Sequence, residues 1–164
     1  MKLIAIASLI PDAIIDLRYA SDDNITGHRL YEVGTEPMLD EPAARQLTRA
    51  AAILRDQSLR LVIWDAYRPL RVQAQLRAVN DDERYVLAVS NHCKGLAIDV
   101  TLADKDGTYL AMGGDFDDFS ERAYVNASGL YPEELAHRKQ LQAAMSQAGF
   151  KVWLYEWWHF DFEG

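Results

Sequence analysis

The amino-acid sequence predicts an α+β fold, because strand-like and helix-like segments both occur and do not alternate regularly. Three segments have the spacing and end signals of helices, and the remaining regular segments are β-branched or aromatic, as strands are. The last two strand-like segments, FKVWLY and WWHFDF, follow one another with no helix between them. The sequence contains no repeat, low-complexity run or linker, so we expect a single domain over residues 1–164.

The first helix is predicted to start at Asp40-Glu41-Pro42 and to continue over AARQLTRAAAILRDQ. Aspartate is a favourable N-cap residue, and proline is tolerated in the first turn. Leu47, Ala50, Ala51 and Leu54 then recur at helical spacing and predict one apolar face.

A strand is predicted over Arg60 to Tyr67 (RLVIWDAY), which is β-branched and aromatic. Pro69 then begins a second helix, LRVQAQLRAV. The side chains on its neighbouring turns are Val72, Gln75, Leu76 and Val79.

Alternating residues predict a further strand over Gly95 to Leu102 (GLAIDVTL), and the following DKDG, Asp104 to Gly107, predicts a turn. The third helix is expected from Pro132 to about Ala148, with acidic residues in its first turn. Gly149 fits the position that ends it.

Charge and cysteine content restrict the possible partners. The net charge is −8, and the basic residues are scattered, so nucleic acid and anionic membranes are unfavourable partners. We expect a small molecule or a peptide instead. Cys93 is the only cysteine and excludes an intrachain disulfide. The oligomeric state cannot be read from the sequence.

The N-terminal segment MKLIAIASLIPDA has some features of an export signal, namely a lysine, a short apolar run and a triplet of small residues. The triplet lies too close to the N-terminus, and Pro11-Asp12 interrupts the run. We therefore expect a cytoplasmic protein, or a periplasmic one if a signal peptide has been removed. No apolar run approaches the ~20 residues that span a bilayer.

Two of the four histidines have neighbours that suggest chemistry, whereas His28 and His137 lie among polar residues. His92 precedes Asp99 by seven residues, and Gly95 between them allows the backbone to bend. An imidazole and a carboxylate suit zinc, although an aspartate on an alternating strand more often faces solvent.

The segment EWWHF adds Glu156 and His159 near the C-terminus. Residues three apart on a regular strand point to opposite faces, so a bulge near Trp157-Trp158 would be needed to bring them together. His92, Asp99 and His159 would then bind a metal ion, and Glu156 would remain free to act as a general base. The alternative interpretation is that Glu156 and His159 are ordinary polar residues at the edge of a sheet.

Arg68 leaves the end of the predicted strand in WDAYRP, where a side chain can project into a cleft. The alternative is a salt bridge between Arg68 and a nearby carboxylate such as Asp65.

In this order, the motifs WDAYRP, S-x-H-x-x-G-x-A-I-D and EWWH resemble the zinc D-alanyl-D-alanine dipeptidases of the VanX type. DLRYASDDNITG, Asp16 to Gly27, is similar to the opening motif of that family, with Ile25 in place of phenylalanine. The segment Met112 to Arg122 is similar to its M-G-x-x-F-D motif. The resemblance covers about Asp12 to Phe160. This sequence departs from the family pattern in two places: the stretch between Pro69 and Ser90 is shorter, and the C-terminus follows soon after the last motif.

The resemblance implies a role for eight residues. The metal ligands would be His92, Asp99 and His159, the catalytic carboxylate Glu156 and the active-site arginine Arg68. Substrate contacts would come from Ser90, Asp117 and Tyr19. The implied fold is the α+β metallopeptidase fold shared with D-Ala-D-Ala carboxypeptidases and the hedgehog domain, a small, mainly antiparallel sheet flanked by about three helices.

The implied activity is hydrolysis of D-alanyl-D-alanine or a related D-dipeptide, with one zinc ion activating water and Glu156 as the base. Asp117 would bind the substrate ammonium, and Arg68 either the oxyanion or the substrate carboxylate. One alternative is a D,D- or L,D-carboxypeptidase that acts on peptidoglycan stem peptides. Another is a non-catalytic zinc module, against which the presence of Glu156 and Arg68 argues. Cys93 is expected to be a small neighbour of His92 and not a nucleophile.

Overall fold

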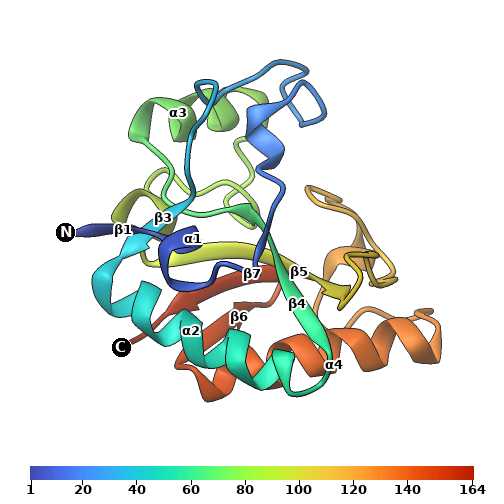
Figure 1. The fold of residues 1–164 in the computed structure, drawn as a ribbon. Helices are drawn as coiled ribbons and strands as arrows, with labels where there is room; N and C mark the ends of the chain where they lie inside the picture. The colour runs from blue at the N-terminus through green and yellow to red at the C-terminus, as the bar shows by residue number, and fades with distance from the viewer.

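The computed structural model describes all residues, Met1–Gly164, and is α+β as predicted (Figure 1). Two β-sheets are present. The smaller pairs β1 with β3 antiparallel, and the larger has the order β2-β4-β5-β7-β6. Only the β2–β4 pair in the larger sheet is parallel. The α-helices and strands are β1 (Leu3–Ala5), α1 (Ile6–Leu9), β2 (Ile14–Ile15), β3 (Met38–Asp40), α2 (Glu41–Arg55), β4 (Leu59–Asp65), α3 (Leu70–Val79), β5 (Ala97–Asp104), α4 (Pro132–Gln147), β6 (Phe150–Trp153) and β7 (Glu156–Phe162). Three short 3₁₀ helices complete the chain: η1 (Arg18–Ala20), η2 (Asn91–Lys94) and η3 (Glu121–Ala123).

Helices α2 and α4 lie side by side along one face of the larger sheet (Figure 1). The predicted apolar face of α2, Leu47 to Leu54, is buried there. On β5, Ile98 and Val100 join the same core. Because side chains alternate along a strand, Asp99 between them points to the opposite face. Helix α3 lies on that second side, where Val72 and Leu76 form a smaller core cluster.

Several sequence predictions need correction in detail. Asp40 stands at the N-cap of α2 but does not cap it, because its carboxylate accepts a hydrogen bond from the backbone N–H of Lys2. Strand β4 ends at Asp65, before the predicted Tyr67. In α3, Val79 is exposed, whereas the polar Gln73 is buried. The turn after β5 and the left-handed Gly149 are confirmed.

The N-terminal segment is part of the fold, since Ile6 and Ile10 are buried in the main core. None of the helices has the length and apolar character that crossing a bilayer requires.

Arg138 of α4 is buried and fixes the loop between β5 and α4. Its guanidinium donates to the backbone carbonyls of Met112 (2.6 Å), Arg122 (2.8 Å) and Tyr124 (3.1 Å). It also stacks on Trp157, 5.1 Å from the ring centroid. One side chain therefore ties two separate parts of the loop, Met112 and Arg122–Tyr124, to α4 and Trp157. This role was not predictable from the sequence pattern, because an arginine in a charged helix is usually solvated.

Candidate active site

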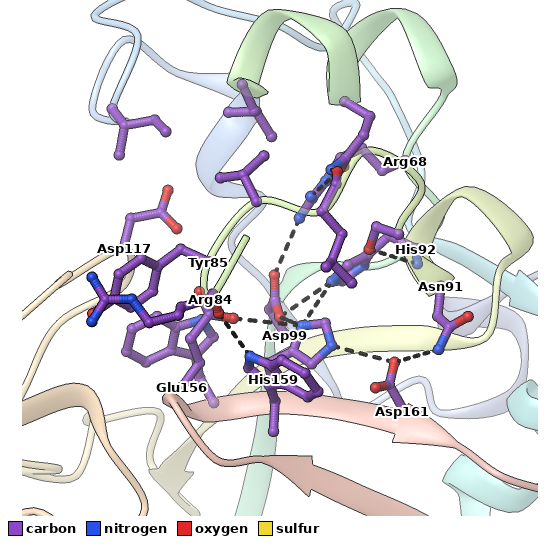
Figure 2. A pocket seen from close by; sticks show the side chains of 18 of the residues that line it. Arg68, Arg84, Tyr85, Asn91, His92, Asp99, Asp117, Glu156, His159 and Asp161 are labelled. Atoms are coloured by element: carbon purple, nitrogen blue, oxygen red, sulfur yellow. Dashed lines mark hydrogen bonds and ion pairs between the residues drawn. The ribbon is translucent and has the colours of Figure 1, made fainter. Parts of the chain in front are cut away.

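The larger sheet and η2 bring together the three predicted metal ligands (Figure 2). Asp99 of β5 and His159 of β7 are direct register partners on neighbouring antiparallel strands. His92 reaches them from η2, where the Ser90 hydroxyl accepts a hydrogen bond from the His92 backbone N–H. Gly95 ends η2 in a left-handed conformation with φ of +67°, as the predicted bend requires. A Cβ there would lie 2.8 Å from the Asp40 nitrogen, so only glycine fits.

The three ligand atoms lie at separations that suit a metal ion. Nδ1 of His159 is 3.0 Å from Oδ1 of Asp99 and 3.2 Å from Nε2 of His92, which is 3.3 Å from the same Oδ1. Tetrahedral zinc, with bonds of ~2.0–2.1 Å, places its ligand atoms about 3.3 Å apart. Nδ1 of His92 lies 2.7 Å from the carbonyl oxygen of Ala66. That oxygen can only accept, so Nδ1 carries the proton and Nε2 presents a lone pair to the cluster.

The electrostatics of this cluster favour a bound cation. Burial lowers the pKa of His159, but the carboxylates of Asp161 and Asp99 outweigh it and raise that pKa to about 10. Burial likewise opposes ionisation of Asp99, but His92 and His159 hold its pKa below the usual range. A divalent metal ion would compete with protons for these same atoms.

Glu156 reaches the cluster because β7 is irregular at the predicted place. On β6, Val152 pairs with Phe160, whereas the next residue, Trp153, pairs with Glu156. Three residues of β7 therefore bulge between those two pairs. Oε2 of Glu156 lies 3.8 Å from Nδ1 of His159, so the two side chains share one side, which a regular strand would not allow.

The carboxyl group of Glu156 is buried, which raises its pKa well above the usual value, with His159 opposing the shift. A carboxyl group with a raised pKa accepts a proton more readily, which suits a role in proton transfer. The two tryptophans between Glu156 and His159 are buried and perpendicular to each other, and they hold the bulge in place.

Arg68 fulfils both interpretations made from the sequence. Its side chain is buried in a salt bridge with Asp65, with Nε 2.8 Å and Nη2 2.7 Å from Oδ2. It also lines the cavity, and Nη2 lies 3.5 Å from Oδ2 of Asp99. Nη1 donates to Oε1 of Gln73 at 2.7 Å, and Asp65 also accepts from the hydroxyl of Tyr31. The guanidinium is thus held rigidly beside the ligand cluster.

Asp117 and Tyr19 line the same cavity, and Figure 2 shows Asp117 on the Glu156 side of the ligand cluster. The Tyr19 hydroxyl donates to Oδ2 of Asp117 at 2.9 Å. Asp117 adopts a positive φ of 55°, which is uncommon for a residue other than glycine and often marks functional positions. Burial raises the pKa of Asp117 to about 7. No cationic side chain is paired with this carboxylate.

All eight predicted site residues line one cavity of about 40 Å³. A single water needs roughly 10–15 Å³ by this measure, so the cavity is small and largely enclosed. Its walls also include Arg84 to Leu87 from the stretch after α3, together with Trp153, Asn91 and Asp161.

The sequence matches the model of a peptidase family described as D-ala-D-ala dipeptidase over residues 1–164. The chain belongs to the D-ala-D-ala dipeptidase family. A D-alanyl-D-alanine dipeptidase of Escherichia coli is 39% identical over 163 residues, which covers 98% of this chain and 84% of the relative. Another, from Enterococcus faecium, is 32% identical and covers 88% of this chain and 83% of that one.

Solved structures confirm the fold of this family member. A zinc-bound variant of the vancomycin-resistance D,D-pentapeptidase VanY aligns with a TM-score of 0.50 at 15% identity, over 82% of this chain and 78% of that chain. The LD-carboxypeptidase LdcB aligns with a TM-score of 0.52 at 18% identity, over 82% and 64%. The family resemblance read from the sequence motifs is therefore confirmed, together with the fold that it implied.

Sequence reasoning missed three residues of the site. Asp65 was considered only as the salt-bridge partner of Arg68, although it orients that side chain. Gln73 is the buried polar residue that links Arg68 to the carbonyl of Leu87, 2.6 Å from its Nε2. Asp161, which lies beside His159, could have been found from its place two residues further along the same strand.

Proposed function

We propose that this chain is a zinc-dependent dipeptidase that hydrolyses D-alanyl-D-alanine or a closely related D-dipeptide. The names of its relatives and the chemistry of the cavity support this assignment. His92, Asp99 and His159 would hold the ion, since two imidazoles and one carboxylate are a frequent ligand set of catalytic zinc. When bound there, zinc supplies Lewis-acid chemistry, which acidifies water and polarises a carbonyl group.

Glu156 is assigned as the general base. Its carboxylate is buried beside His159 and pairs with no arginine or lysine side chain. In this position it accepts a proton from the attacking water and returns it to the leaving amine. Such proton transfer contributes roughly 10²–10⁴-fold to a rate.

Arg68 is assigned the role of stabilising the negative charge that develops on the substrate oxygen. Asp65 holds Nε and Nη2, and Gln73 holds Nη1, while Nη2 also lies 3.5 Å from Oδ2 of Asp99 in the ligand cluster. A donor fixed before the reaction stabilises an oxyanion without reorganisation.

Asp117 and Tyr19 are assigned the role of binding the ammonium group of the substrate. A free dipeptide carries an ammonium group two bonds from the scissile carbonyl, and the unpaired Asp117 carboxylate lies on the Glu156 side of the cluster. Ser90 contributes a hydroxyl to the cavity wall. The small enclosed volume favours a dipeptide over a longer stem peptide.

The observation that carries the proposal is the convergence of three ligand atoms in one cavity with a buried glutamate that pairs with no arginine or lysine side chain. The test compares D-Ala-D-Ala with a stem pentapeptide, using zinc-loaded protein and the same protein after chelation. We expect cleavage of the dipeptide only, loss of activity on chelation, and recovery on adding zinc.

Equal cleavage of the pentapeptide would replace the dipeptidase with the carboxypeptidase alternative. Zinc binding without hydrolysis of either peptide would instead support a non-catalytic zinc module.

A further inference from the structure

The two ring nitrogens of His159 face different partners (Figure 2). Nδ1 points into the ligand cluster, whereas Nε2 lies 3.3 Å from Oδ1 of Asp161. Asp161 follows His159 by two residues on β7, so both side chains stand on the same face of the strand. The carboxylate of Asp161 is only partly exposed, at 24%.

Asp161 is itself held from the other ligand-bearing segment. Nδ2 of Asn91 donates to the same Oδ1 at 3.0 Å, and Asn91 directly precedes His92 in η2. Oδ1 of Asn91 in turn accepts from Nζ of Lys94 at 3.1 Å. A short polar chain therefore links η2 to β7 behind the ligand cluster, on the side away from Glu156 and Asp117 (Figure 2).

This contact decides which nitrogen of His159 is available to a metal. Asp99 also faces this ring, at Nδ1, but its carboxylate is one of the proposed metal ligands. Asp161 is therefore the carboxylate left to keep the proton on Nε2, which leaves the lone pair on Nδ1, where the other two ligand atoms meet. It also fixes the rotation of the ring. His92 receives the equivalent support from the backbone carbonyl of Ala66, which no side-chain substitution removes.

We propose that Asp161 is a positioning residue that sets the tautomer and ring orientation of His159 for metal binding, and that Asn91 holds Asp161 in place. The inference rests on the proposed function, because the ion is part of it. Removal of such outer partners typically weakens metal binding 10–100-fold.

The test is the zinc affinity of the purified full-length chain, measured by competition with a chromophoric chelator, for wild type and four variants. Asp161→Ala should bind zinc 10–100-fold more weakly. Asp161→Asn should recover part of that loss, because its amide oxygen still accepts from Nε2–H but carries no charge. Asn91→Ala should cause a smaller loss. Glu163→Gln is the matched control, since Glu163 is an exposed carboxylate just past β7 that pairs only with Lys151, and its affinity should be unchanged.

Thermal unfolding of the zinc-free proteins separates positioning from general stability. The proposal expects zinc-free Asp161→Ala to unfold near the wild-type temperature. Wild-type affinity in Asp161→Ala would overturn the inference and leave the proposed function intact. Equal losses in Asp161→Ala and Asp161→Asn, with lower unfolding temperatures without zinc, would assign Asp161 a purely structural role and also overturn it. A wild-type chain that binds no zinc would refute the proposed function, and the inference with it.

Discussion

Asp99 and His159 are register partners on adjacent antiparallel strands, and the side-chain contact between Oδ1 and Nδ1 is 3.0 Å. Two of the three ligand atoms are therefore placed by the hydrogen-bond ladder of the sheet and not by loops. A slip of one residue between β5 and β7 would turn one of these side chains to the other face, toward α2 and α4. The sheet therefore determines how accurately these two ligand atoms are placed, and the packing of Ile98 and Phe160 in the core maintains the sheet.

Substitution of Glu156 should separate chemistry from metal binding. Glu156→Gln keeps the shape of the side chain and removes its basicity, so kcat should fall roughly 10²–10⁴-fold. The zinc content should stay at the wild-type level, because Glu156 is not one of the three ligand atoms. Steady-state kinetics and metal analysis of the same preparation check both parts. A fully active variant would exclude Glu156 as the base.

Arg68→Lys tests whether the arginine acts on the developing oxyanion. Lysine keeps the charge but loses the fork that is held by Asp65 and Gln73. We expect kcat to fall roughly 10²–10³-fold with little change in KM, as for the loss of one oxyanion donor. A rise in KM at constant kcat would instead assign Arg68 to the substrate carboxylate.

The pH dependence of KM should report on Asp117. Because its pKa is raised to about 7, the carboxylate is ionised above that pH and protonated below it. An ammonium ligand binds the ionised form, so KM should rise as the pH falls below about 7. Asp117→Asn should remove this dependence and raise KM at pH 7.5 about 10–100-fold, the worth of a hydrogen bond to a charged group. Persistence of the acid limb in Asp117→Asn would show that another group causes it.

Arg138→Met should destabilise the fold, since it leaves the carbonyls of Met112 and Arg122 without their donor and removes one of the two donors to the carbonyl of Tyr124. We expect the free energy of unfolding to fall by about 3 kcal/mol or more, measured by denaturant titration. The control is Lys139→Met at the next, exposed position of α4, which should change stability by less than about 0.5 kcal/mol. Equal effects of the two substitutions would contradict the anchoring role.

The regular elements were predictable because their signals are local. Helix α3 lies over the residues that Pro69 and the following pattern indicated, and α4 begins at Pro132. The bulge in β7 was also predictable, because Glu156 and His159 cannot share a face on a regular strand. In each case the spacing of a few neighbouring residues carried the information.

Apart from the place of Asp161 beside His159, the contacts that hold the outer partners of the site were not predictable, because they join distant segments. The pairing of Asn91 with Asp161 joins residues 70 positions apart. The burial of Gln73 and Arg138 likewise depends on which loop covers each helix, and helical periodicity carries no signal for that. The short strands β1, β2 and β3 were missed because they have only two or three residues each.

The meeting of three lone-pair atoms has a thermodynamic consequence for the whole chain. In the unfolded state the proposed ligands are separated by up to 67 residues and offer no site, so the proposed zinc ion would bind the folded state selectively. Mass action would then make the stability of the fold a function of the free zinc concentration, with a gain of about 2.7 kcal/mol at one hundred times the dissociation constant. In zinc-starved cells the protein would lose its activity and, at the same time, part of its resistance to proteolysis. Its abundance would therefore follow the zinc supply without any dedicated regulator.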